Sequence, residues 1–189
     1  MSDAIREKVV AKLQEIGGGS AIAFELDVDK YFDVMSALLE EFALTKKLNC
    51  IYITASIPST TLINAFGALG IDISRIQFVD CVSKSIFGNA PPLENVSYLD
   101  SPTMLENVIL KVEYLLKKYQ GKEAVIFIDS VSALAVYNDT GMLTEFFQIL
   151  LNSLRSKGNY AIMIAIANQI KPDVREMLAL VSDEVVNLS

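Results

Sequence analysis

The stretch AVIFIDSVSALAVYNDTGMLTEFFQILLNSLRSKGNYAIMIA, residues 124–165, decides the fold of this chain. Its first apolar run predicts a buried strand at 124–129, and a second run predicts another at 160–167. Between them, apolar residues recur at helical spacing over 140–157, where Arg155, Lys157 and Gly158 are typical stop signals. A strand, a helix and a strand in this order predict a parallel pair in an α/β protein.

The rest of the chain repeats this alternation of apolar strands and helices. We therefore expect one α/β domain over residues 1–189, a three-layer sandwich with a mainly parallel sheet. The N-terminal helix, at about 2–16, is amphipathic. Further strands are expected at 20–26, 50–55, 76–82 and 184–188, a loop at 83–95, a short extended piece at 96–99, and helices at 29–46, from Pro58 to Gly67, from Ser101-Pro102 to Gly121, and after Pro172.

Composition excludes several classes of function. The chain carries a net charge of −7 and has no histidine, which removes serine–histidine hydrolysis and histidine-based zinc chemistry. An acidic chain is repelled by nucleic acid phosphates. We find no local basic face in the sequence, because Lys46-Lys47 and Lys117-Lys118 are typical of helix ends. We expect no nucleic acid partner.

A membrane location is not expected either. The longest apolar run, residues 160–167, is too short to span a bilayer, and the N-terminus has no signal peptide. Cys50 and Cys81 lie within or at the end of apolar strands, which favours buried thiols over a disulfide. These features predict a cytoplasmic protein.

Three stretches resemble the RecA superfamily of P-loop ATPases, and specifically its KaiC-like branch. They are residues 125–165 of the stretch quoted above, IYITASIPSTTLINAFGALGIDISRIQFVD at 51–80, and GGGSAIAFEL at 17–26. Their order and spacing carry the resemblance, since each motif alone is only moderately specific. With the six expected strands numbered along the chain, the resemblance implies the sheet order 3-2-4-5-1-6.

The chain departs from this family at the phosphate-binding loop. When residues 17–26 are laid on the family's first strand, the loop falls on Leu26–Phe32, the Walker A lysine on Phe32, and the magnesium-binding hydroxyl on Asp33. A P-loop needs glycines, so that backbone N–H groups wrap the phosphates, and a lysine that neutralises them. We expect a bulky ring and clustered carboxylates to fill this pocket. The degenerate nucleotide-binding positions implied by the resemblance are Asp29, Lys30, Tyr31, Phe32, Asp33, Asp129 and Ser130.

The catalytic groups that the resemblance implies are missing as well. Ala55 and Ser56 stand where KaiC-like ATPases place a carboxylate pair that activates water. Asp129 has lost the P-loop hydroxyl that would share Mg²⁺ with it. We therefore expect no enzyme activity and no cofactor, and read Asp129-Ser130 as a cap that shapes the following turn. The expected role is a regulatory or scaffolding domain in signalling, which binds protein partners such as itself or an active KaiC-like relative.

An alternative role stays open at the same strand ends. Asp27, Asp29 and Asp129 are acidic residues placed as in phosphoacceptor receiver domains, and Lys171 follows the fifth expected strand. They predict a weak Mg²⁺ site, or a phosphoacceptor at Asp129. The simpler interpretation of Asp27 and Asp29 is helix N-capping. A nucleotide bound in an unrelated cleft is a third hypothesis.

Overall fold

Strands and helices alternate along this protein, whose structure is a computed structural model that describes residues 2–189. Within these residues there are seven strands, and each of the six expected from apolar runs is among them. The added strand is a three-residue segment where the sequence indicated only an extended piece. In chain order the strands are β1 (Ala21–Leu26), β2 (Asn49–Thr54), β3 (Ile76–Asp80), β4 (Val96–Tyr98), β5 (Ala124–Asp129), β6 (Tyr160–Ile166) and β7 (Glu184–Asn187).

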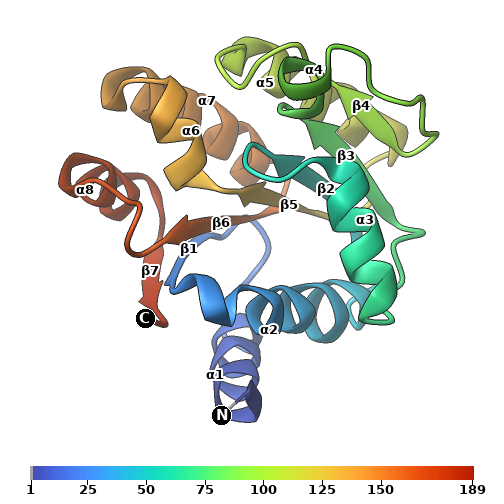
Figure 1. Ribbon diagram of the computed structural model, residues 1–189. Helices are drawn as coiled ribbons and strands as arrows, with labels where there is room; N and C mark the ends of the chain where they lie inside the picture. Colours follow the sequence, from blue (N-terminus) through green and yellow to red (C-terminus); the bar gives the residue numbers. More distant parts are fainter. Residues whose placement is uncertain (1) are drawn as a thin grey trace.

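All these strands join one sheet in the order β4-β3-β2-β5-β6-β1-β7, and every pairing between neighbours is parallel (Figure 1). Without β4, this order is the one that the family resemblance implied, so that prediction is confirmed. The short β4 extends the sheet beyond β3 at one edge, while β7 forms the other edge.

Helices cover both faces of the sheet and complete the predicted three-layer sandwich (Figure 1). One face packs against α1, α2, η2 and α3, and the other against α5, α6, α7 and α8. The five inner strands are buried almost throughout, because each face of the sheet has its own apolar core, whereas the edge strands β4 and β7 are partly exposed. The helices are α1 (Ser2–Gln14), η1 (Val28–Lys30), α2 (Tyr31–Ser36), η2 (Ala37–Leu44), α3 (Ser59–Ala68), α4 (Ser83–Phe87), α5 (Leu105–Lys118), α6 (Val131–Tyr137), α7 (Thr140–Ser156) and α8 (Pro172–Val181).

Three helix predictions differ from the structure. The helix expected at 29–46 is a succession of a 3₁₀ turn, an α-helix and a π-helix. The loop expected at 83–95 begins with α4, because the Asp80 carboxylate accepts the N–H of Ser83 at 2.8 Å and fixes the first turn. Pro102 does not open α5, which begins at Leu105. It lies in the preceding turn, where its carbonyl accepts the Asn138 side-chain amide at 3.2 Å.

The two ends of the strands differ chemically. Because all strands run parallel, their carboxyl ends lie together along one side of the sheet, here called the carboxyl edge, and their amino ends lie along the opposite side, the amino edge. The carboxyl ends of the strands meet at one edge, where Thr54 pairs in register with Asp80 on one side and with Asp129 on the other. The amino ends meet at the opposite edge.

Among residues 2–189, no helix combines the length and the apolar character that crossing a membrane requires.

Candidate functional site

The candidate site lies at the carboxyl edge of the sheet, around the last residue of β5. One carboxylate oxygen of Asp129, Oδ2, accepts a hydrogen bond from the Tyr31 hydroxyl at 2.5 Å and another from the Tyr52 hydroxyl at 2.6 Å. The two hydroxyls lie 3.0 Å apart. Asp129 has 1% of its surface exposed, Tyr52 has none and Tyr31 has 6%. The site is therefore a closed polar cluster inside an apolar core.

The sequence builds this cluster from two strands and a helix. Asp129 and Tyr52 lie on adjacent strands and face the same side of the sheet, because side chains alternate along a strand. The Tyr52 ring packs against Phe66, Phe78 and Phe127, with centroid separations of 5.5 to 5.9 Å, so its hydroxyl has a fixed position. Tyr31 is the first residue of α2 and belongs to the same apolar core as Tyr52, on one face of the sheet.

Burial governs the ionisation of this cluster. It raises the pKa of Asp129, and the hydrogen bonds from the two tyrosines oppose this effect without cancelling it. Burial also raises the pKa of Tyr31 and of Tyr52, and the neighbouring Asp129 carboxylate adds to the rise. Both phenols thus stay protonated and act as donors to Asp129, whose pKa remains above the ordinary aspartate value.

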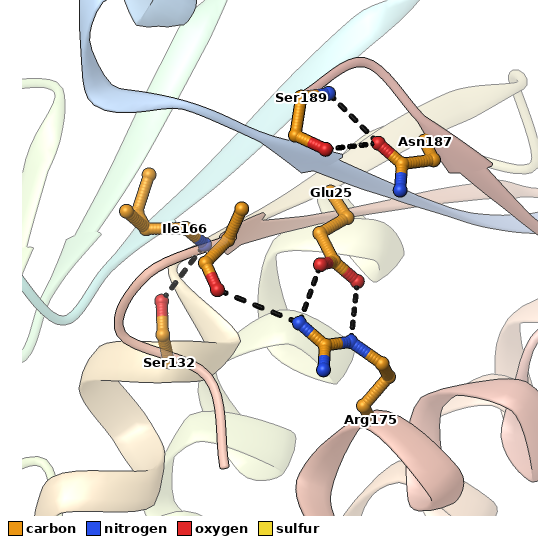
Figure 2. Close-up of polar contacts among 7 residues, drawn as sticks. Glu25, Ser132, Ile166, Arg175, Asn187 and Ser189 are labelled. Atoms are coloured by element: carbon orange, nitrogen blue, oxygen red, sulfur yellow. Dashed lines mark hydrogen bonds and ion pairs between the residues drawn. The ribbon is translucent and has the colours of Figure 1, made fainter. Parts of the chain in front are cut away.

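The residue that follows Asp129 has the capping role expected of it. The Ser130 hydroxyl accepts the N–H of Ala133 at 3.1 Å and so caps α6. The hydroxyls of Ser130 and Ser132 lie 3.1 Å apart. The Ser132 hydroxyl also accepts the N–H of Ile166 at 3.1 Å, and this bond joins α6 to the end of β6 (Figure 2). The hydroxyl of Ser130 is thereby committed to local structure.

The residues laid on the phosphate loop do not fill the pocket as predicted. The ring that enters the core is Tyr31, whereas Phe32 has 45% of its surface exposed and Asp33 is half-buried. Successive residues on a helix point about 100° apart, so an inward Tyr31 places Phe32 outward. The expectation that Phe32 and clustered carboxylates occupy the pocket is therefore wrong. The sequence pointed to Tyr31 only through its place in the stretch that the resemblance assigned to the phosphate-binding loop.

The acidic residues proposed for a metal site are not gathered. Asp27 pairs with Lys30 at 3.1 Å, and Asp29 is exposed, while Asp129 is sealed beneath Tyr31. Nowhere in the part of the chain that the structure describes do three or more acidic or cysteine side chains form a group suited to a metal ion. Asp27 occupies the N-cap position of η1 without a side-chain capping bond.

Lys30, the cation in the stretch aligned with the phosphate-binding loop, is bonded to other groups of the protein. Besides its ion pair with Asp27, its ammonium donates to the carbonyl of Leu188 at 2.9 Å. This bond joins the segment after β1 to the segment after β7. Lys30 therefore stabilises the C-terminal edge strand from a position where the resemblance placed phosphate-binding residues.

Sequence reasoning missed Asp80, a second buried carboxylate at this edge. It accepts the N–H groups of Ser59, Val82 and Ser83, each at 2.8 Å, and the Ser83 hydroxyl at 2.6 Å. Burial opposes its ionisation, but the hydrogen bonds from Ser59 and Ser83 outweigh burial and lower its pKa. Asp80 thus holds the starts of α3 and α4. An acidic residue at the end of an apolar strand was the available signal.

A third buried carboxylate, Glu25, lies near the end of β1 and is neutralised by an arginine. Figure 2 shows the guanidinium of Arg175 facing Glu25, with Nε and Nη2 donating to its two oxygens at 2.9 and 2.6 Å. Arg175 belongs to α8 and also reaches the carbonyl of Ala167 at 3.4 Å. This bidentate pair anchors α8 on the sheet and leaves no free carboxylate there.

Comparison with known proteins places this architecture among the KaiC-like ATPases. The family model described as "ATPase: KaiC" matches residues 37–189, so the match begins after the positions of the expected phosphate loop. Among curated proteins, none matches the sequence significantly.

Solved structures share the fold at low sequence identity. One is a KaiC-like protein from the hyperthermophilic archaeon Pyrococcus horikoshii OT3, with 16% identity and a TM-score of 0.63, aligned over 91% of this chain and 74% of its own. Another is an uncharacterised protein from Pyrococcus horikoshii, solved in complex with an unknown peptide. It has 17% identity and a TM-score of 0.69, over 96% of this chain and 82% of its own.

Proposed function

The chain belongs to the KaiC ATPase family, and we propose that it is a member that no longer turns over ATP and serves as a regulatory or scaffolding protein-interaction domain in signalling. The observation that carries this proposal is the closed cluster around Asp129. In P-loop ATPases the strand-end aspartate helps to hold Mg²⁺ and needs an accessible oxygen. Here Oδ2 accepts bonds from two buried phenols.

The electrostatics of the former loop support the same proposal. Residues 26–33 contain no glycine, and their only cation, Lys30, is already bonded to Asp27 and Leu188. A triphosphate above this loop would meet Asp29 and Asp33 without a neutralising lysine. Each such repulsion costs on the order of a few kcal/mol in a partly screened cleft.

The missing general base is a separate argument. Ala55 is buried and Ser56 is exposed, and neither side chain activates a water molecule as a carboxylate does. A nucleotide that did bind would therefore lack the group that starts hydrolysis. Loss of binding and loss of chemistry are thus independent grounds for inactivity.

The protein-interaction role is supported by an apolar groove between α5 and α7. Ile109, Met142 and Ile149 line it, and the side chains of Met142 and Ile149 are each 50% exposed. Glu106 and Glu145 also line the groove. The fitting partner is a protein segment that carries apolar residues flanked by lysine or arginine. A structural neighbour was solved with an unknown peptide, which agrees with peptide binding on this fold.

Thermal unfolding with nucleotides tests the loss of ATP binding. ATP, GTP and a non-hydrolysable ATP analogue are added with and without Mg²⁺, and the midpoint of unfolding is recorded. A ligand present at a hundred times its Kd stabilises a protein by about 2.7 kcal/mol, which is readily seen. We expect no shift and no phosphate release. A Mg²⁺-dependent shift that Asp129→Asn removes would contradict the proposal.

Thermal unfolding of the wild-type protein with beryllofluoride tests the phosphoacceptor alternative. Beryllofluoride with Mg²⁺ mimics an aspartyl phosphate, and it should leave the unfolding midpoint unchanged because Asp129 is buried under Tyr31. Stabilisation that depends on Asp129 would favour a receiver-like site instead of a scaffold.

A further inference from the structure

A basic hollow lies at the amino edge of the sheet, at the opposite ends of the strands from Asp129. Its volume is about 560 Å³. No local basic face was expected, because Lys46-Lys47 are typical of a helix end, and the structure corrects this expectation. The polar side chains that line the basic hollow are Lys46, Lys47, Asn49, Arg75, Lys122 and Glu123.

The topology of the sheet brings these distant residues together. Strands β3, β2 and β5 are neighbours, so the residues that precede them meet at one edge. The backbone fixes this arrangement, because the N–H of Asn49 donates to the carbonyl of Glu123 at 3.3 Å and the N–H of Cys50 donates to that of Arg75 at 3.1 Å. Lys46 and Lys47 follow η2 and complete the hollow from the helix side.

The cations of the basic hollow outnumber the acidic groups near them, which include Glu123 in the lining and Asp72 near Arg75. None of its three lysines and its arginine forms an ion pair with a carboxylate among the side chains that the structure describes. Elsewhere Lys12, Lys30 and Arg175 each have such a partner. Glu123 is the one carboxylate in the described lining. In a chain of net charge −7, four cations without an ion pair thus lie together around one hollow, although single lysines elsewhere, such as Lys111 and Lys171, also form no ion pair among the described side chains.

Two of these cations are held in position before any ligand arrives. The Nη1 of Arg75 donates to the carbonyl of Lys47 at 2.8 Å, which orients the guanidinium and leaves its other N–H groups available. The ammonium of Lys46 lies 5.5 Å from the centre of the Phe42 ring and 5.9 Å from that of Tyr160. Positioned donors lose less conformational entropy when they bind.

We propose that the basic hollow binds a small soluble anion that carries two or more phosphate groups. A guanidinium fork recognises phosphate oxygens, and several lysines supply charge for a multivalent ligand. The hollow has the volume of a small-molecule site. Because this site lies at the amino ends of the strands, its binding of an anion does not depend on whether the site around Asp129 binds ATP.

Calorimetric titration with inorganic tripolyphosphate at low salt tests this proposal on the full chain. We expect binding of one tripolyphosphate per chain that weakens as salt is added. Arg75→Gln and Lys122→Gln should each weaken binding by about tenfold, the size of one lost charge-assisted contact. Arg75→Lys keeps the charge but loses the fork, and should fall between Arg75→Gln and wild type. The matched control is Lys171→Gln, an exposed lysine at the carboxyl edge, which should bind as wild type does.

A loss of binding is attributed to the substituted side chain only in variants that fold as the wild type does. Each variant is first shown by circular dichroism to unfold at the temperature of the wild type. Lack of tripolyphosphate binding by folded wild type would overturn the proposal, as would equal loss in Lys171→Gln. The protein is also tested for binding to vesicles of phosphatidylcholine with phosphatidylinositol bisphosphate, and to single-stranded DNA. Binding to either of these without binding to tripolyphosphate would assign the hollow to a membrane or a nucleic acid, and would also overturn the proposal.

Discussion

Asp80 and Asp129 end two strands that flank β2, yet their surroundings are opposite. Both are buried, and Thr54 pairs in register with each of them. Asp80 accepts three backbone N–H groups and a serine hydroxyl, and its pKa is lowered. Asp129 accepts two phenols inside an apolar core, and its pKa is raised. Burial acts on both, so the donors decide in which direction each pKa moves.

The two surroundings distinguish a carboxylate that supports the fold from one at the position of the family site. The carboxylate that organises the helix starts, Asp80, is stabilised by backbone groups that the fold itself positions. The carboxylate at the position that the family resemblance assigns to Mg²⁺, Asp129, is covered by Tyr31. Asp80 is thus a structural anion, and Asp129 is a closed carboxylate, which we propose to be a remnant of the family's Mg²⁺ site.

Removing the charge at Asp80 should produce the largest effect. In Asp80→Asn the amide nitrogen cannot accept the N–H groups of Ser59, Val82 and Ser83, so some buried donors lose their partner. We expect a loss of about 3 kcal/mol in the free energy of unfolding at pH 7, measured by urea denaturation. Asp29→Asn, at an exposed position on the same edge, is the matched control and should unfold as wild type does.

The pH dependence sharpens this prediction. The pKa of Asp80 is lowered on folding, so its stabilisation is present above the unfolded value of about 4 and is lost as the pH falls through the folded value. The difference between Asp80→Asn and wild type should therefore shrink below about pH 4. A difference that stays constant from pH 7 to pH 3 would contradict an ionised Asp80.

Tyr31→Phe should have an intermediate effect. It removes one of the two hydrogen bonds to Asp129 while leaving the ring in the core, and it should cost about 1 to 2 kcal/mol in the free energy of unfolding. Tyr137→Phe changes a tyrosine that is 54% exposed and is the control, with a change of less than about 0.5 kcal/mol. Equal effects of the two substitutions would show that the Tyr31 bond does not stabilise the fold.

Asp129→Asn should have the smallest effect at neutral pH, within about 1 kcal/mol, because the amide keeps the shape and accepts the phenol bonds. The pKa of Asp129 is raised on folding, so its contribution is fully present below about pH 4 and is lost as the pH rises through the folded value. Relative to this variant, wild-type stability should fall as the pH rises, which is the opposite of the trend at Asp80. A parallel trend at both positions would contradict the comparison.

The sequence predicted the strands well because apolar runs in a parallel sheet are buried on both faces. The strand order came from the resemblance, and the structure confirms it. Helix starts were predicted less well. Pro102 was read as the first turn of α5, but tertiary contacts place it in a turn. The short β4 was missed as a strand, since three residues give too little pattern.

The site was predicted only in part. The loop residues and Asp129 were identified, but the choice between Tyr31 and Phe32 depended on the rotation of α2, which the local pattern does not fix. Tyr52 lay unnoticed inside an apolar run, although strand alternation puts it on the face of Asp129. The basic hollow could not be predicted, because it joins the starts of three strands that are far apart in the sequence.

The most direct test of the closed site is the carboxyl resonance of Asp129, followed by carbon-13 NMR and assigned by its absence in Asp129→Asn. In wild type it should titrate above the usual aspartate range and should not respond to Mg²⁺ with ATP. A resonance that titrates at the ordinary value, and that moves when Mg²⁺ and ATP are added, would show an open metal-binding carboxylate and contradict the account.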